Sequence, residues 1–150
     1  MVNTKASKTA EQAMKKGSNC CEAVLMAANS VWNLNLDGDM LASAAFFEEG
    51  MGSGCTCGAL IGIVMASGIL HHKRSHPLGR NLPKRLHDRF KEEFGSTCCR
   101  VIQSNRPLLE KIRSKAACID LTSRAAVMLV EEWEGTWDDQ SAGVCNNSDS

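Results

Sequence analysis

Residues 50–70 have the sequence GMGSGCTCGALIGIVMASGIL, which joins a glycine-rich segment, two cysteines and a long apolar run. The apolar part, 59–70, is far shorter than the ~20 residues that a membrane-spanning helix requires, so it predicts a buried central helix that starts near Cys57. The small residues of this helix, from Gly58 to Ala66, would let a second helix approach closely. The glycines of 50–54 predict a flexible loop that leads into it.

Helical periodicity extends outward from this segment in both directions. No stretch shows sustained alternation of apolar and polar residues, so no strand is predicted. We expect an all-α, single-domain bundle of about five to six helices over residues 1–134, followed by a flexible polar tail at 135–150. A homodimer formed through the small-residue face of the central helix is a further expectation. The other predicted helices are 20–32, about 40–49, about 86–94, 98–104 and about 121–133.

Composition excludes several classes of function. The 150 residues carry no formal net charge, so the overall balance does not point to nucleic acid or to an anionic membrane surface as a partner. Residues 1–17 contain no continuous apolar stretch and therefore predict neither a secretory signal nor a membrane anchor. We expect a cytoplasmic protein without membrane insertion.

Cysteine is abundant, and in a reducing compartment such a count favours metal binding, thiol redox chemistry or catalysis over a disulfide scaffold. A Gly-Ser-x-Cys pattern occurs three times, at residues 17–20, 52–55 and 95–98, each time at a predicted helix start. Cys118 follows Ser114 in a similar position. The eight cysteines are Cys20, Cys21, Cys55, Cys57, Cys98, Cys99, Cys118 and Cys145.

A helix start is chemically significant because its free N–H groups and its dipole stabilise a thiolate, which lowers the pKa of a cysteine there. The alternative is that Cys20, Cys21 and Cys118 are small buried hydrophobic residues. No Cys-x-x-Cys pair or ferredoxin-type run is present, so any site must be assembled from distant segments. Vicinal cysteines such as Cys20 and Cys21 rarely bond to each other, which favours bonds between segments.

All four histidines lie in the basic segment 71–91. A stretch so rich in charge is usually a solvated loop and helix face. The alternative is a site for an anion or an acidic partner. His72 and His76 are four residues apart, but Pro77 argues against a helical metal-binding pair.

Four motifs in this chain resemble those of the C-GCAxxG-C-C family of small redox-active proteins. The central motif, Gly50-Met51-Gly52 followed by TCGALIG at 56–62, is the most specific of them. The others are NCCEAV at 19–24, Phe94-Gly95 followed by Cys99-Arg100, and Cys118 followed by Ala125-Ala126.

The resemblance implies that Cys20, Cys57, Cys99 and Cys118 are the family cysteines and that the other four are additions. It also implies redox activity, since some members of the family contain selenocysteine. A related domain occurs in split-Soret cytochromes, where an iron-sulfur centre has been proposed.

Two functional hypotheses follow, both of oxidoreductase type if the protein is an enzyme. In the first, Cys20, Cys57, Cys99 and Cys118 bind an iron-sulfur cluster or another thiophilic metal for electron transfer, with Cys21, Cys55 and Cys98 as secondary candidate ligands. In the second, no metal is involved; Cys57 is the catalytic nucleophile and another family cysteine, best represented by Cys99, resolves the mixed disulfide. The expected partner is a redox protein or a small thiol or disulfide. A helical interaction module with ordinary buried cysteines is the third option.

Overall fold

The computed structural model describes residues 1–135, and their fold is all-α, as predicted. Five helices have at least thirteen residues each. The described residues contain no strand, only one isolated β-bridge between Thr56 and Cys98. The long helices are α1 (Val2–Lys15), α2 (Cys20–Trp32), α4 (Gly58–Arg74), α5 (Leu82–Phe94) and α8 (Ser114–Gly135); the short ones are α3 (Gly38–Ala42), α6 (Cys99–Ser104) and α7 (Leu108–Ile112).

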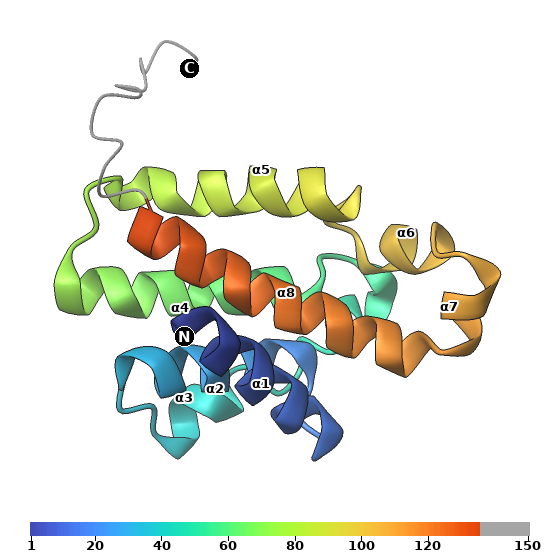
Figure 1. The fold of residues 1–150 in the computed structure, drawn as a ribbon, viewed down its shortest axis with the longest axis horizontal. Coiled ribbons are helices and arrows are strands. Elements are labelled where there is room, and N and C mark those ends of the chain that lie inside the picture. Colours follow the sequence, from blue (N-terminus) through green and yellow to red (C-terminus); the bar gives the residue numbers. More distant parts are fainter. Residues whose placement is uncertain (136–150) are drawn as a thin grey trace, which may run out of the picture.

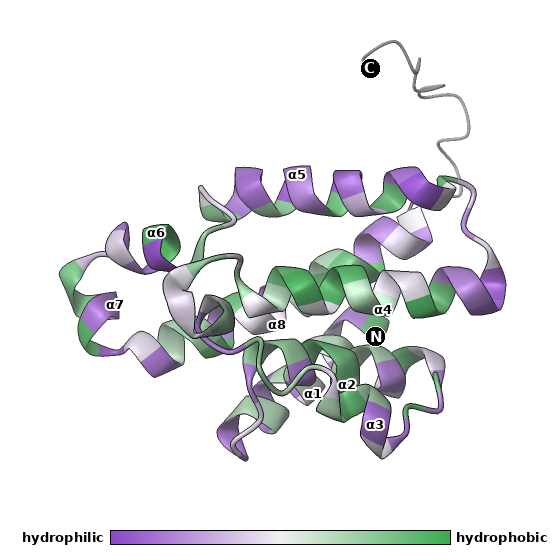
Figure 2. Ribbon diagram, turned by 180° about the vertical axis from the view of Figure 1, so that it is seen from behind, coloured by the Kyte–Doolittle hydropathy of each residue, from purple (hydrophilic) through white to green (hydrophobic). Residues whose placement is uncertain are grey.

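The long helices form a bundle with α4 and α8 in its middle (Figure 1). Helix α5 lies along one side of this central pair, and α1 and α2 lie along the other, while α6 and α7 extend from one end. Apolar residues are concentrated on the helix faces that point inward, most clearly on α2 and α4 (Figure 2). The bundle therefore buries one continuous hydrophobic core.

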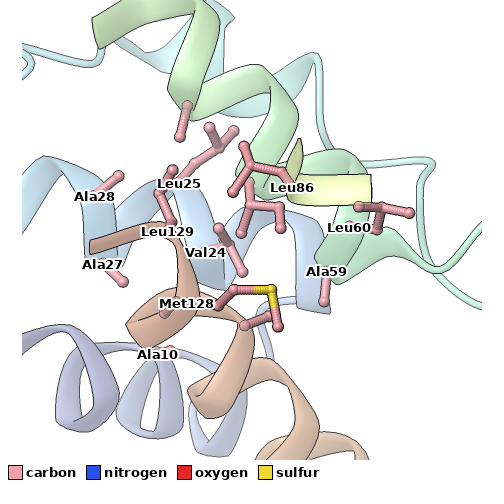
Figure 3. Close-up of a cluster of buried hydrophobic side chains, with 14 of the residues drawn as sticks. Ala10, Val24, Leu25, Ala27, Ala28, Ala59, Leu60, Leu86, Met128 and Leu129 are labelled. Carbon is pink, nitrogen blue, oxygen red and sulfur yellow. The ribbon is translucent and has the colours of Figure 1, made fainter. Parts of the chain in front are cut away.

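The core forms where α2, α4 and α8 meet, and Figure 3 labels buried side chains that these helices contribute to it, among them Val24, Ala59 and Met128. Gly62 permits this contact, because a Cβ atom at its position would lie 2.9 Å from Val24 Cβ. The small residues of α4 are thus covered by α2 within the same chain. The prediction that this face forms a homodimer interface is wrong for that reason.

The predicted helix at about 40–49 is also wrong, since α3 ends at Ala42 and turns follow. The side-chain amide of Asn19 donates hydrogen bonds to the carbonyls of Ala44 and Ala45, both at 3.1 Å. These carbonyls are therefore bound to a residue distant in sequence instead of continuing a helical ladder. As a result, Phe46 is 91% exposed.

Helix α1 was not predicted, because its buried residues Ala6, Ala10 and Ala13 give only a weak apolar signal. Helix α7 was missed as well.

Among the described helices, none is both long enough and apolar enough to cross a bilayer. The predicted flexible tail lies outside the described residues except for Gly135, which ends α8.

Candidate functional site

The four cysteines of the family pattern line one cavity of about 310 Å³ at the end of the bundle from which α6 and α7 extend (Figure 1). Cys20 is the first residue of α2, Cys57 is the N-cap of α4, Cys99 is the first residue of α6 and Cys118 is the fifth residue of α8. The cavity therefore collects thiols from four segments that are far apart in the sequence. Its charged lining residues are Glu48, Glu49, Arg106 and Lys115.

The vicinal cysteines of α2 point in different directions. Asn19 caps this helix by accepting a hydrogen bond of 2.8 Å from the Glu22 N–H, and the Glu22 carboxylate accepts one of 3.0 Å from the Asn19 N–H. Successive residues of a helix are about 100° apart around its axis. Cys20 consequently faces the cavity, whereas Cys21 is fully buried, with its Sγ 3.7 Å from the Met65 Sδ.

A glycine fixes the packing of Cys20 against the start of α4. A Cβ atom at Gly58 would lie 2.4 Å from Cys20 Sγ and 2.2 Å from the carbonyl oxygen of Phe47. No larger residue fits at this position without displacing one of these groups. The Cys-Gly pair of the central motif therefore places Cys57 beside Cys20.

An antiparallel contact between two distant segments holds Cys57 near Cys99. The Cys57 N–H donates to the Thr97 carbonyl at 2.8 Å, and the Cys99 N–H donates to the Cys55 carbonyl at 2.6 Å. These bonds flank the Thr56–Cys98 bridge. The glycine loop before α4 is thus attached directly to the start of α6.

Two side chains that the sequence analysis did not identify contact the sulfurs of Cys99 and Cys118. The amide of Gln103 donates to Cys99 Sγ at 3.1 Å, and both terminal nitrogens of Arg106 lie 3.5 Å from Cys118 Sγ. Gln103 is four residues after Cys99 on α6, so helical spacing could have indicated it. No local pattern links Arg106 to Cys118.

We call Cys99 and Cys118 the outer pair, and Cys20 and Cys57 the inner pair.

Burial and, to a lesser extent, the nearby thiol of Cys57 raise the pKa of Cys20 to about 12. Burial also raises the pKa of Cys57 to about 11, although the N–H groups of Ala59 and Leu60 act in the opposite direction. The pKa of Cys99 is raised too, chiefly by burial. The expectation that helix starts lower these pKa values is therefore wrong, because loss of hydration outweighs the helix N-terminus.

The thiols also influence one another. Charge on Cys57 or Cys118 raises the pKa of Cys20, and charge on Cys99 or Cys118 raises that of Cys57. Such coupling requires the sulfurs to be near neighbours across the cavity. The deprotonated forms of all four would repel one another strongly.

The secondary candidate ligands lie elsewhere. Cys21 faces the core, Cys55 is exposed, and the thiol of Cys98 donates to the Gly54 carbonyl at 3.0 Å. None of the three lines the cavity. Cys145 lies outside the described residues.

The basic segment 71–91 is only partly the solvated surface that was predicted. His76 is 4% exposed, and its ring Nε2 lies 3.3 Å from the Trp133 carbonyl oxygen. Arg89 pairs with Glu131 and Glu132 on α8. Within residues 1–135, no three His, Cys, Asp or Glu side chains are grouped closely enough to hold a metal ion, and this includes His72 and His76.

Comparison with known proteins gives one match. The family model described as "Putative redox-active protein (C_GCAxxG_C_C)" matches residues 18–132, a span that contains all four cysteines of the cavity. No curated protein and no solved structure matches the chain. Because the family model covers most of the chain and its motif cysteines line one cavity, this protein belongs to the C_GCAxxG_C_C family.

Proposed function

We propose that this protein is a thiol-disulfide redox protein in which the outer pair, Cys99 and Cys118, alternates between two thiols and one disulfide. One observation carries the proposal: four cysteines from four distant segments line a single cavity. A chain that needed only small buried hydrophobic residues would have no reason to gather their sulfurs at a shared opening.

Cys118 is the better nucleophile of the cavity. The Arg106 guanidinium lies 3.5 Å from its sulfur, and an adjacent cation stabilises a thiolate. Cys57, the nucleophile expected from the sequence, is only 6% exposed and has a pKa of about 11, so its thiolate is scarce near neutral pH. We therefore assign the attack to Cys118 and retain Cys99 as the resolving thiol.

The reaction exchanges one disulfide for another. The Cys118 thiolate attacks one sulfur of a substrate disulfide, whose S–S bond breaks and releases the first substrate thiolate. The Cys99 thiolate then attacks the Cys118 sulfur, which forms the Cys99–Cys118 disulfide and releases the second substrate thiolate. The protein loses two electrons and two protons, and the substrate gains them.

The cavity favours a small disulfide or the exposed disulfide loop of a redox partner. Its volume of about 310 Å³ admits a small molecule. Arg106 and Lys115 lie on its lining together with Glu48 and Glu49, so charges of both signs are available to a substrate with an amine and a carboxylate.

A thiolate-bound iron-sulfur cluster or single metal is the second candidate. The donor chemistry favours it, because four thiols suit thiophilic metals. The spacing of the side chains does not favour a cluster or metal, since no three potential ligands among residues 1–135 are grouped around one point. The metal is therefore not part of the reaction described above.

Anaerobic redox titration tests the proposal. The fully reduced protein is equilibrated with thiol-disulfide buffers, quenched in acid, alkylated and mapped by mass spectrometry, and metal and acid-labile sulfide are measured on the same sample. We expect one two-electron couple that produces a Cys99–Cys118 disulfide and is abolished by Cys118→Ser. Cys21→Ala is the matched control, since Cys21 faces the core, and should titrate like the wild type.

Two results would overturn the proposal. One is the absence of any disulfide between cavity cysteines at every potential. The other is stoichiometric iron and sulfide that disappear in Cys20→Ser and Cys57→Ser, which would establish the cluster instead.

A further inference from the structure

Cys55 lies outside the cavity, but the backbone places it directly opposite Cys99. The two segments run antiparallel, with Thr56 opposite Cys98 and with hydrogen bonds from Cys57 to Thr97 and from Cys99 to Cys55. Gly54 continues the same register, because a Cβ atom there would lie 3.0 Å from Arg100 Cβ.

The hydrogen bond limits the separation of the two cysteines. The Cys99 nitrogen is 2.6 Å from the Cys55 carbonyl oxygen. Adding the intervening N–Cα, Cα–C and C=O bonds gives a Cα–Cα separation of at most about 6.8 Å, and the bend at the carbonyl carbon shortens it. Disulfides form at Cα–Cα separations of about 4.4–6.8 Å, so the backbone separation of this pair permits a bridge.

The register also separates Cys55 from its neighbour Cys98. Directly opposed residues of an antiparallel pair project to the same face, and the next residues along project to the other. The register thus places Cys55 opposite Cys99, whereas Cys98 lies opposite Thr56 and its thiol donates to the Gly54 carbonyl.

The two cysteines of this pair differ in their exposure to solvent. Of the cysteines that the structure describes, Cys55 is the exposed one, while Cys99 is half-buried and lines the cavity with Cys118. Gly50 holds Cys55 in this place, since a Cβ atom at Gly50 would lie 2.4 Å from the Cys55 backbone nitrogen. Cys99 therefore lies between a thiol at the surface and the thiols of the cavity.

We propose that Cys55 is an entry thiol, which accepts oxidising equivalents from disulfides too large for the cavity and passes them to Cys99. The inference rests on the proposed function of the outer pair. It identifies the substrate class as bulky or protein-borne disulfides that meet Cys55 at the surface.

Each transfer is a thiol-disulfide exchange. The Cys55 thiolate attacks a substrate disulfide, and the first substrate thiolate leaves. The Cys99 thiolate attacks the Cys55 sulfur, so that a Cys55–Cys99 disulfide forms and the second substrate thiolate leaves. The Cys118 thiolate then attacks the Cys99 sulfur, which yields the Cys99–Cys118 disulfide and returns Cys55 as a thiolate.

Stopped-flow oxidation of the reduced, full-length protein by one equivalent of a folded protein whose single cysteine carries a thionitrobenzoate mixed disulfide, which releases a coloured thiolate when it is attacked, tests the relay with a disulfide too large for the cavity. We expect Cys55→Ser to slow formation of the Cys99–Cys118 disulfide at least tenfold, without changing the equilibrium potential of that couple. The matched control is Cys98→Ser, which should react at the wild-type rate. In Cys99→Ser, the substrate protein should remain attached to Cys55 as a mixed disulfide.

The outcomes separate the two proposals. Equal rates for Cys55→Ser and Cys98→Ser would overturn the relay and leave the outer pair intact. A Cys55–Cys99 disulfide in a wild-type protein that never forms the Cys99–Cys118 bond would overturn the proposed function while supporting the entry step.

Discussion

The two ends of the bundle differ in the way their buried polar groups are arranged. At the end remote from the cavity, the buried Glu132 pairs with Arg85 at 2.5 Å and with Arg89 at 2.9 Å, and the His76 ring packs at a tilt against Trp133 with ring centroids 4.7 Å apart. At the cavity end, four thiols line one cavity, and burial together with the neighbouring thiols raises the pKa of Cys20, Cys57 and Cys99. Pairing opposite charges serves stability, whereas gathering like groups costs stability and is typical of functional sites.

The largest predicted effect concerns the reactivity of the buried thiols. Burial raises the pKa of Cys21 to about 12 from an ordinary value near 9, so its thiolate is about a thousandfold scarcer than in the unfolded chain at the same pH. Alkylation of Cys21 at neutral pH, followed by mass spectrometry, should be at least about a thousandfold slower in the native protein than in urea. Cys55, which is exposed, should be the fastest native site. Comparable native rates at the two positions would contradict this account.

The next effect is steric and tests how rigidly the cavity end is built. Gly58→Ala should lower the free energy of unfolding by about 1–3 kcal/mol, because the new Cβ collides with Cys20 Sγ and the Phe47 carbonyl. Gly68→Ala is the matched control on the same helix, where a Cβ atom meets nothing within 4 Å. It should stabilise the protein by about 0.5–1 kcal/mol. Urea unfolding measures both, and a loss of the same size at the two sites would exclude the steric explanation.

A smaller effect tests the pairing at the remote end. Glu132→Gln should cost about 1–2 kcal/mol in urea unfolding, because it removes the charge that Arg85 and Arg89 share. The control is Glu93→Gln, since the Glu93–Arg124 pair is solvent-accessible and should contribute less than about 0.5 kcal/mol. Oxidation of the outer pair should proceed normally in both variants. An altered redox couple in Glu132→Gln would show that the two ends are not independent.

The smallest effect is a pH dependence of stability. The pKa of His76 is lowered, chiefly because burial disfavours the charged ring. Below its ordinary pKa of about 6.5, the unfolded chain binds this proton more readily than the folded protein does, so stability should fall as the pH falls through this range. Urea titrations from pH 7.5 to about 5 should show this slope, and His76→Gln should reduce it.

Local sequence signals predicted much of the fold. Helix α4 follows from an apolar run after a glycine loop, α2 from its Asn19 cap, and the end of α5 from Gly95, which adopts a positive φ of 81°. Helix α1 escaped prediction because alanine is too weakly apolar to mark a buried face. The segment after α3 escaped it because Asn19, from another helix, binds its carbonyls.

The cysteines that line the cavity could be predicted from the sequence, but their pKa values could not. The motif resemblance singled out Cys20, Cys57, Cys99 and Cys118, and these are the cysteines that line the cavity. The raised pKa values of Cys20, Cys57 and Cys99 could not be foreseen, because burial depends on helices that pack over these cysteines. Arg106 could not be linked to Cys118 for the same reason, since turns and α7 separate the two in the chain.

The sequence by itself determined where several helices begin or end, such as α2 at Asn19 and α5 at Gly95, because caps and turns act over about four residues. Only the tertiary structure decided which sulfurs share a cavity, which cation contacts Cys118, and that Cys55 faces Cys99 across the antiparallel contact. These relations join residues about 12 to about 100 positions apart, and they follow from how whole helices pack and exclude water.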